Sequence, residues 1–336
     1  MVKRLSRLGG CAFLPGAPDT GCSPSVLGCL LGAVFLISAL ASPAGAAESG
    51  FSAYGLGTSA FSAGETPPPG TYVSAGVAAI RGDINGALTF GGIEIDVAMQ
   101  IKEFISPSAN LLYVPKQTFL GGRAGFSMTV PFGFVDIAAQ ATGPLGNTVE
   151  LATHGWGLGD MVPRLQLGWD NGDFHHSIYI QGLLPTGRYE VGFNPNIGLN
   201  RPAIDFGWGF TYIEPTSKLQ LNGTFGLTTS FENQATDYDT GDEFHFEWAV
   251  GKDFGHGVVL GVVGYDYRQL SDDTGAGVPA ILNGFKGEVD AVGPGLTYTT
   301  QIGKIPFILN ARHYEEFNAK NRFDNSVTLI TGTFVF

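Results

Sequence analysis

The feature that most constrains this chain is the stretch SKLQLNGTFGLTTSF at residues 217–231, in which apolar or small residues alternate with polar ones. Successive side chains of a β-strand point to opposite faces, so this alternation predicts a strand with one apolar and one polar face. The same pattern returns in IEIDVAMQIK (93–102), DEFHFEWAVGKDF (242–254) and KIPFILNARHY (304–314). We therefore expect many strands, each of which separates an apolar environment from a polar one.

The composition supports an all-β protein. Only 14% of the 336 residues are charged, while glycine and phenylalanine are abundant, with 50 and 25 residues. Few long helix-forming side chains, together with many glycines and aromatic residues, favour strands joined by turns. The formal net charge of −12 makes the chain a poor candidate for binding nucleic acid.

The segment 1–47 differs from the rest of the chain and indicates export. A basic start is followed by an apolar run at 26–40 and by the small-residue pattern at 44–46. This order is typical of a cleaved signal peptide, and the apolar run is shorter than the roughly 20 residues that a membrane-spanning helix needs. The exported chain therefore offers no disulfide, thiolate metal site or thiol nucleophile, because all cysteines lie in this segment: Cys11, Cys22 and Cys29.

The spacing of the alternating segments predicts a closed barrel. We expect about twelve strands, joined by connections that alternate between short and long: 93–104, 118–130, 132–142, 155–169, 174–186, 203–213, 217–231, 242–253, 257–269, 286–300, 303–316 and 325–336. The connections include a tight turn at Pro131 and a long loop at 105–117. Outer-membrane β-barrels have short turns in the periplasm and long loops outside. We therefore expect an all-β transmembrane outer-membrane β-barrel of antiparallel strands over residues 93–336, in a Gram-negative outer membrane.

The stretch 48–92 has several interpretations. It is rich in small residues and contains PPPG at 67–70. It could form a periplasmic lead, a partial plug of the barrel, or one extra hairpin, which would give fourteen strands. Within the expected strands, Pro163 and Pro306 would each remove a ladder hydrogen bond, so we expect bulges there or strand starts shifted by a few residues.

A soluble β-sandwich or a small ligand-binding barrel is the competing fold. The expected strands are about twice as long as the five or six residues usual in soluble proteins. The chain also ends in TLITGTFVF, with Phe334 and Phe336. An aromatic final residue resembles the signal by which the barrel assembly machinery recognises outer-membrane barrels. We therefore expect outer-membrane lipid and this machinery among the partners.

Six motifs carry a resemblance to a known family: GWGLGDMVPRLQLGW (155–169), LPTGRYE (184–190), NPNIGLNR (194–201), TDYDTGDEFHFEWAVG (236–251), GYDYRQLSDDTG (264–275) and GPGLTY (293–298). In this order and spacing, from about Pro69 to its end, the chain resembles the predicted outer-membrane transporters named for the meta-pathway of phenol degradation. The resemblance implies passage of an aromatic or hydrophobic solute. It supplies no catalytic residues.

The polar faces of the expected strands should point into the lumen and set the width and the field of a pore. The pore-lining candidates are Arg164, Gln181, Lys218, Gln220, Asn222, His245, Glu247, Asp266, Arg268, Asn310 and Arg312. The long loops 187–202 and 270–285 carry apolar residues that could narrow the mouth, namely Tyr189, Phe193, Ile197, Leu199, Val278, Ile281, Leu282 and Phe285. The expected function is a passive channel or transporter for small, aromatic or hydrophobic molecules, with no cofactor, no metal and no catalytic residue.

Two other classes remain as alternatives. A structural or adhesive surface barrel would use its loops, which sequence alone does not exclude. An outer-membrane barrel lipase would need a serine and a histidine on one face, but Ser177 and His176 are neighbours, and neighbouring side chains of a strand point to opposite faces.

Acidic loop residues could also bind calcium that bridges lipopolysaccharide phosphates: Asp237, Asp239, Asp242, Asp272 and Asp273.

Overall fold

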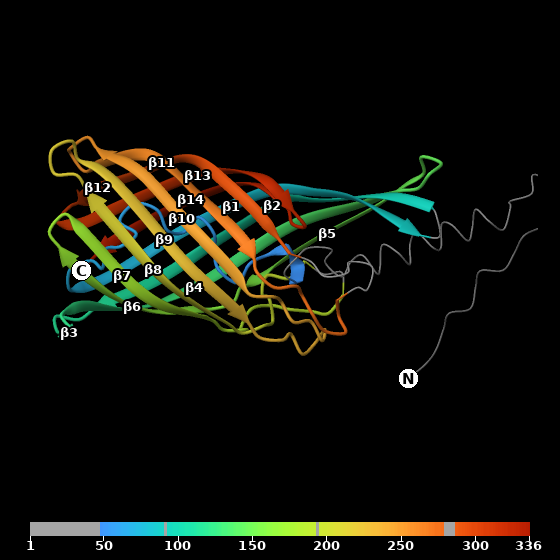
Figure 1. The fold of residues 1–336 in the computed structure, drawn as a ribbon, viewed down its shortest axis with the longest axis horizontal. Coiled ribbons are helices and arrows are strands. Elements are labelled where there is room, and N and C mark those ends of the chain that lie inside the picture. The colour runs from blue at the N-terminus through green and yellow to red at the C-terminus, as the bar shows by residue number, and fades with distance from the viewer. Residues whose placement is uncertain (1–47, 91–92, 193–194, 279–285) are drawn as a thin grey trace, which may run out of the picture.

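The computed structural model describes residues 48–90, 93–192, 195–278 and 286–336 (Figure 1). Apart from the short 3-10 helix η1 (Glu48–Gly50), the regular elements in this part of the chain are strands. They are β1 (Gly70–Phe90), β2 (Ile93–Val114), β3 (Thr118–Phe119), β4 (Gly122–Thr142), β5 (Thr148–Leu158), β6 (Val162–Asn171), β7 (Phe174–Leu183), β8 (Ala203–Ile213), β9 (Leu219–Ser230), β10 (Glu243–Asp253), β11 (Val258–Gln269), β12 (Glu288–Ile302), β13 (Ile305–Lys320) and β14 (Asp324–Val335). Among the residues described, no helix is both long enough and apolar enough to span a bilayer.

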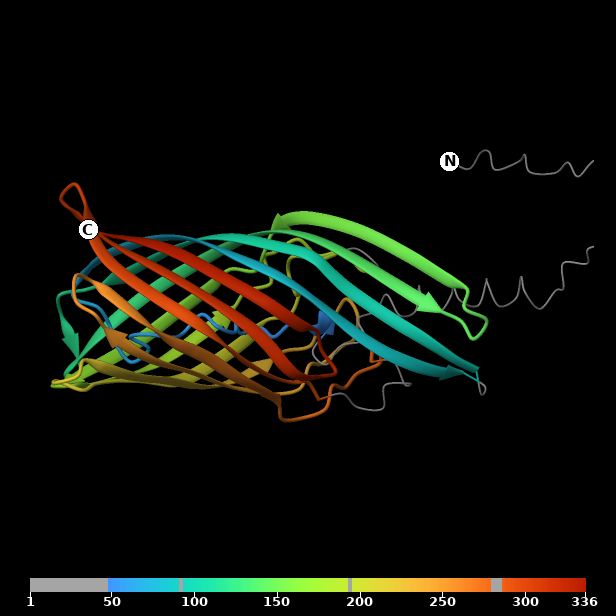
Figure 2. The same ribbon diagram turned by 90° about the horizontal axis from the view of Figure 1, so that it is seen from above.

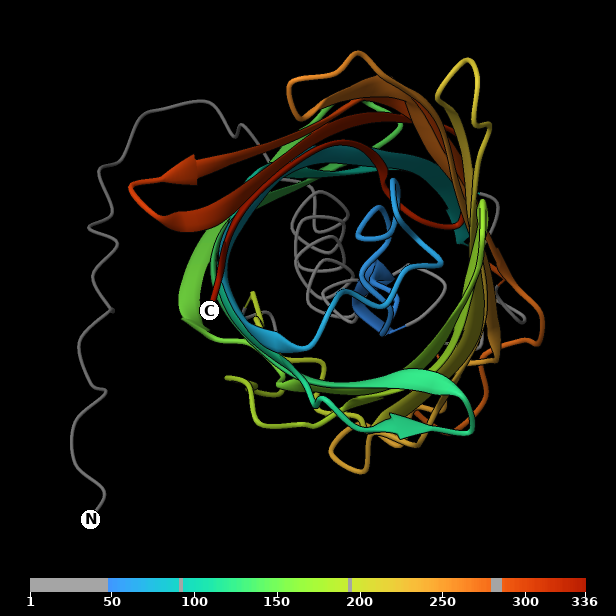
Figure 3. The same cartoon turned by 90° about the vertical axis from the view of Figure 1, so that its left-hand side faces the viewer.

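The strands close into a ring, as the end-on view shows (Figure 3). The last strand, β14, pairs with β1 in antiparallel register from Tyr72↔Val335 to Asp83↔Asp324. On its other edge β1 pairs with β2, and β2 pairs with β4, which completes the circuit back through β6 to β13. The result is a closed antiparallel barrel of 12 strands, with 2 further strands, as the sequence predicted for the fold class.

One wall position is built from two strands placed end to end. Residues 132–142 of β4 pair with β5, ending at Phe132↔Leu158, and residues 123–129 of β4 pair with β6, ending at Thr129↔Val162. The break between β5 and β6 lies opposite Pro131, which has no N–H to donate. The carbonyl of Pro131 accepts a hydrogen bond from the N–H of Gly159 at 2.9 Å. Because the partner is already interrupted there, a proline is accommodated inside a barrel strand.

The strand assignments from the sequence need four corrections, although their number is confirmed. The single strand expected at 155–169 is wrong, because β5 ends at Leu158 and β6 begins at Val162. The barrel begins upstream of Ile93, because residues 70–90 form wall strand β1. The tight turn expected at Pro131 is wrong, since β4 runs straight through it, and the long loop expected at 105–117 is wrong, since β2 continues to Val114. Because β1 was missed and β4 was counted as two strands, the expected total of about twelve strands was still correct.

The two ends of the barrel differ. At the end that holds the C-terminus, short turns join the strands, and the turn between β12 and β13 holds only residues 303–304. Longer connections lie at the opposite end, where β1, β2 and β4, of 21 or 22 residues, project beyond the other strands together with β5 (Figures 1 and 2). By the usual orientation of such barrels the short-turn end is periplasmic and the long-loop end extracellular. As expected, Pro163 and Pro306 stand near strand starts, each as the second residue of β6 or β13.

The outer face of the wall is apolar and exposed. It carries Val73, Val77, Leu111, Phe126, Met128, Leu165, Ile178, Ile180, Ile204, Phe206, Trp208, Leu221, Phe225, Leu227, Val250, Leu260, Val262, Val292 and Ile330. A soluble protein rarely exposes so large an apolar area, whereas a barrel in lipid requires it. Toward the short-turn end Trp169 stacks on His176, and Phe307 packs on Phe334, as in the aromatic belts of such barrels. The apolar face seen in the sequence pattern therefore meets lipid.

We predict that Val262→Arg destabilises the folded barrel by about 2–4 kcal/mol, because Val262 lies in the middle of β11 on the lipid face. Val258→Arg is the matched control, since Val258 has the same strand parity but is the first residue of β11 at the short-turn end. There the cost should fall to about 0–1 kcal/mol. The measurement is a urea titration in lipid, read by the heat-modifiable mobility of the folded band. Equal destabilisation by the two variants would contradict the assigned membrane position.

Candidate functional site

The interior of the barrel is occupied by the chain's own N-terminal segment. Residues 48–69, named here the lumen segment, run inside the ring from η1 at the long-loop end to the start of β1 at the short-turn end (Figure 3). Tyr54, Ala60 and Phe61 of this segment are buried. The stretch 48–92 is thus divided, because residues 48–69 lie in the lumen and 70–90 in the wall.

Glycines on the inner wall make room for the lumen segment. A Cβ at Gly251 would overlap the ring of Phe61, and a Cβ at Gly295 would lie 3.0 Å from the same ring. A Cβ at Gly209 would lie 2.5 Å from the carbonyl oxygen of Ala63. Since real Cβ atoms do not approach other atoms that closely, the close contact between segment and wall depends on these glycines.

Polar groups of the wall bind the backbone of the lumen segment. The N–H of Ser59 donates to Glu247 at 2.7 Å, and the N–H of Ser62 donates to Asn222 at 2.9 Å. The Ser59 hydroxyl also lies 2.7 Å from that of Thr224. Further bonds follow the same segment down the barrel: Gly64 N–H to Thr211, Arg312 to the carbonyls of Gly57 and Thr58, Tyr314 to Gly57, and Arg123 to Thr66. An irregular segment in a barrel needs such partners, because its backbone has no ladder of its own.

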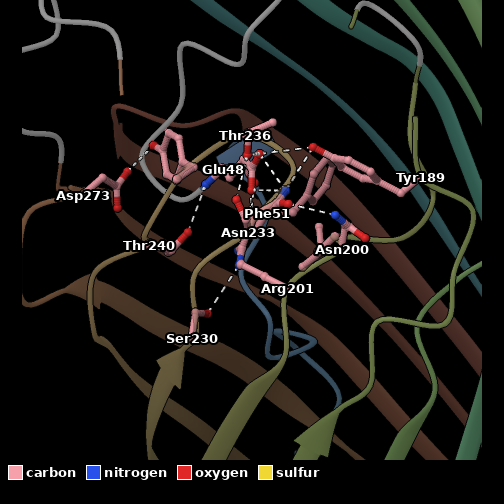
Figure 4. Close-up of polar contacts among 12 residues, drawn as sticks. Glu48, Phe51, Tyr189, Asn200, Arg201, Ser230, Asn233, Thr236, Thr240 and Asp273 are labelled. Carbon is pink, nitrogen blue, oxygen red and sulfur yellow. Dashed lines mark hydrogen bonds and ion pairs between the residues drawn. The ribbon is translucent and has the colours of Figure 1, made fainter. Parts of the chain in front are cut away.

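At the long-loop end of the barrel, hydrogen bonds to the carboxylate of Glu48 hold the lumen segment in place (Figure 4). Asn233 donates to both carboxylate oxygens, at 2.9 and 2.8 Å, and the Thr236 hydroxyl donates at 2.7 Å. Tyr189, from the loop 184–202, donates to the same group at 3.3 Å. Burial, and next the Glu48 carboxylate, raise the pKa of Tyr189, so its hydroxyl stays protonated and able to donate.

The side chain of Arg201 binds the backbone of the lumen segment at the same end. Its guanidinium is fully buried and donates to the carbonyl of Glu48 at 3.1 Å and to that of Phe51 at 2.9 Å. A third bond, at 3.3 Å, reaches the hydroxyl of Ser230 at the end of β9. A buried guanidinium requires this degree of hydrogen bonding. Glu48, Tyr189, Arg201, Asn233 and Thr236 together form what is called here the Glu48 latch.

Tyr54 lies against the wall near the long-loop end, where His245 is the third residue of β10 and Asp205 the third residue of β8. Its ring stacks on the imidazole of His245, with centroids 3.6 Å apart and planes 15° apart. His245 Nε2 lies 3.0 Å from a carboxylate oxygen of Asp205. Close by, the guanidinium of Arg164 lies over the ring of Tyr179, 3.7 Å from its centroid. This level of the lumen therefore combines aromatic faces with charges of both signs.

Most of the expected pore-lining residues lie on the inner face: Arg164, Gln181, Gln220, Asn222, His245, Glu247, Asn310 and Arg312. Several of them contact the lumen segment, and Asn310 pairs with Thr297 at 2.7 Å. Their expected role, to set the width and the field of a pore, stays a prediction.

Three expected pore-lining residues do not face the lumen. Lys218 is exposed in the turn before β9, with a φ of 59°. Asp266 and Arg268 point outward near the long-loop end, where Arg268 contacts Asp266 and Asp290, each at 2.7 Å. Tyr265 and Tyr267 alternate with them and are buried inside. The predicted inward orientation of Asp266 and Arg268 was wrong because the alternating tyrosines were taken as apolar residues that face lipid. Instead, the tyrosine rings fill the lumen, and each hydroxyl donates a hydrogen bond to a glutamate.

Several functional residues were missed. Glu48 and Tyr54 lie in a segment without strand alternation, so nothing local places them in the lumen. Arg201 precedes β8 within one of the family motifs, and its charge gives no sign of burial. The inward orientation of Asp205 could have been predicted from the sequence, because Asp205 alternates with the apolar residues Ile204 and Phe206 in β8.

The long loops contribute differently from the sequence expectation. Tyr189 and Asp273 are engaged in polar contacts: Tyr189 belongs to the Glu48 latch, and Asp273 accepts hydrogen bonds from Gly241 and Gln269. Asp273 was a candidate calcium ligand. Of the expected mouth residues besides Tyr189, Ile197, Leu199 and Val278 are half-buried, while Phe193, Ile281, Leu282 and Phe285 fall outside the described residues. Within the described part of the chain, no group of three acidic, histidine or cysteine side chains is arranged to hold a metal ion.

We predict that Glu48→Ala loosens the upper end of the lumen segment and raises ion conductance in a planar bilayer. Hydrogen bonds to a charged group contribute about 1.5–3 kcal/mol, so the loosened state should be populated about tenfold more or greater. Glu65→Ala is the control, because Glu65 lies on the same segment outside the latch. A conductance unchanged in Glu48→Ala, or raised equally in Glu65→Ala, would count against the latch.

Comparisons with known proteins agree with this geometry. The sequence model of a family described as "Putative MetA-pathway of phenol degradation" matches residues 81–328. No curated protein sequence matches the chain as a relative. Among solved structures, the COG4313 outer membrane channel from Pseudomonas putida F1 has a TM-score of 0.59 at 13% identity, over 81% of this chain and 98% of that one.

Two other solved structures are more distant. The CymD monoaromatic hydrocarbon channel has a TM-score of 0.39 at 9% identity, over 80% of this chain and 89% of that one. A Pseudomonas aeruginosa FadL homologue has a TM-score of 0.38 at 8% identity, over 79% and 89%. The family match spans most of the sequence, and the COG4313 channel shares the fold. The chain is an outer-membrane β-barrel and belongs to the family described as "Putative MetA-pathway of phenol degradation".

Proposed function

We propose that the protein is a passive outer-membrane channel for small aromatic or hydrophobic molecules. The observation that carries this proposal is a closed barrel whose lumen is occupied by a segment of its own chain. The family description refers to phenol degradation, which supports an aromatic solute. The COG4313 protein, which shares the fold, is an outer membrane channel.

Passage through the lumen requires the lumen segment to move. Its polar contacts with the wall are separate hydrogen bonds, each contributing about 0.5–1.5 kcal/mol net, or about 1.5–3 kcal/mol where a charged group takes part, so they can be exchanged one by one. The segment continues directly into β1 and therefore stays attached when it shifts. Gly55 and Gly57 follow Tyr54, and Gly57 has a φ of 81°, a conformation that favours glycine.

The charges of the inner wall fit a neutral solute. The cationic residues Arg164 and Arg312 are interspersed with the acidic residues Asp205 and Glu247, so the described wall shows no ring of one sign. A pore that selects strongly charged solutes normally carries such a ring. The intact protein should therefore conduct ions poorly, and selectivity should come from fit and polarity.

Other functions find less support. A lipase needs a nucleophile beside its base, but Ser177 is buried on the inner face while His176 stacks on Trp169 outside. We therefore propose that the protein is not an enzyme. The exposed apolar face supplies the contact with outer-membrane lipid, and the C-terminal Phe336 would be read by the barrel assembly machinery.

We predict that a cross-link between segment and wall blocks uptake. The hydroxyls of Ser59 and Thr224 lie 2.7 Å apart, so Ser59→Cys with Thr224→Cys should form a disulfide on oxidation. The cysteines of the native sequence all lie within residues 1–47, which we propose are removed, so they would not interfere. Uptake of radiolabelled phenol and toluene by cells should fall to the level of the deletion strain and return after reduction.

The two single-cysteine variants are the controls, because they carry the same substitutions without a cross-link. If the oxidised double variant transports as well as the reduced one, the solute does not need movement of the lumen segment. If deletion of the whole protein leaves uptake unchanged, the transport function itself is wrong.

A further inference from the structure

The side chain of Tyr54 lies in a cluster that does more than fill space. Its ring, 2% exposed, stacks on His245, and the residues around it include Glu247, Tyr179 and Arg164. Asp205 completes the cluster by its contact with His245. These residues are named here the Tyr54 site. They come from β6, β7, β8 and β10 of the wall, whereas Tyr54 alone comes from the lumen segment.

Glycines give the wall side of this site its shape. A Cβ at Gly207 would lie 2.5 Å from the ring of Tyr179, and a Cβ at Gly226 would overlap the imidazole of His245. The two rings therefore lie close to the backbone of β8 and β9. Arg164 covers the ring of Tyr179, whereas His245 offers one face to a second ring, which is that of Tyr54.

Tyr54 itself occupies the polar edge of the site. Its hydroxyl and Glu247 Oε1 are buried and interact with each other, and neither makes a hydrogen bond to a third group among the described residues. His245 Nδ1 has no partner there, although His245 is only 1% exposed. Buried polar atoms usually find partners, so Glu247 needs another hydroxyl at this place whenever Tyr54 leaves it.

We propose that the Tyr54 site binds a phenol, and that the Tyr54 side chain occupies this site while the lumen segment is in place. The tyrosine side chain is itself a phenol, so the wall already shows that it accepts this group. A free phenol would stack on His245 and donate its hydroxyl to Glu247 Oε1, and it would displace Tyr54. The proposal rests on the proposed function, because solute reaches this site through the lumen.

The chemistry distinguishes a phenol from an aromatic hydrocarbon. Both can stack on His245, but toluene has no hydroxyl and would leave the Glu247 acceptor without a partner. A buried acceptor left without a partner costs about 1–3 kcal/mol, which is enough to favour phenol about tenfold. Phe61 lies in contrasting surroundings, since it packs on Gly251, Gly295 and Val263, in the apolar core cluster of the lumen.

The test follows displacement of the lumen segment in the purified protein. In Ser59→Cys with Thr224→Cys, the rate of disulfide formation reports how often the segment is seated. Phenol should slow this reaction at a free concentration about tenfold lower, or less, than toluene requires. Tyr54→Phe keeps the ring but removes the competing hydroxyl, so it should lower the phenol concentration needed. Glu247→Gln keeps the size of the side chain and the bond to Ser59 but replaces the acceptor at Oε1 with an amide N–H donor, so it should weaken the preference for phenol.

Phe61→Ala is the matched control, because it also removes contact between segment and wall but leaves the Tyr54 site intact. It should speed displacement by both solutes without changing the preference for phenol. If phenol and toluene act at equal concentrations, or if neither has any effect and water alone serves the polar atoms, the proposal fails. Uptake of both solutes that depends on the protein would then still support the proposed function, whereas uptake unchanged by its deletion would refute both.

Discussion

The rest of this structure depends on the pairing of β1 with β14. Backbone N–H and C=O groups that face hydrocarbon have no water to bond, so a sheet in lipid must have no free edge. The pairs from Tyr72↔Val335 to Asp83↔Asp324 supply this closure between the first and last strands of the chain. Closure in turn creates an interior that lipid does not reach. The side chains of that interior then need partners of their own.

The lumen segment supplies many of those partners. Buried groups of the wall such as Glu247 and Asn222 bond its backbone, and the Glu48 latch, which includes Arg201, fixes its end near η1 to the long loops. The inner wall can approach the segment closely because glycines stand where other residues would collide. This explains in physical terms why glycine stands at positions such as Gly209, Gly251 and Gly295. It also means that the same contacts both satisfy the interior and close it to solutes.

The sequence predicted the fold class because the polarity contrast in β9 and β10 is strong, with Asn222 and His245 alternating with apolar residues. It missed β1, whose small residues give little contrast between the two faces. A proline normally ends a ladder, so Pro131 divided β4, whereas the fold compensates by interrupting the partner strand. The facing of β11 failed because Tyr265 and Tyr267 were taken as apolar residues although they point into the lumen, which leaves Asp266 and Arg268 to pair with each other outside. The lumen site was beyond reach, since Tyr54 meets His245 only after the whole barrel has closed.

The most direct measurement of this account is the single-channel conductance of the protein with and without its lumen segment. A chain that begins at Pro68 keeps every strand of the wall, because β1 begins at Gly70. If residues 48–67 close the barrel, this shorter chain should fold with the same heat-modifiable mobility and conduct many times better than the full protein. Equal conductance of the two folded proteins would contradict the account.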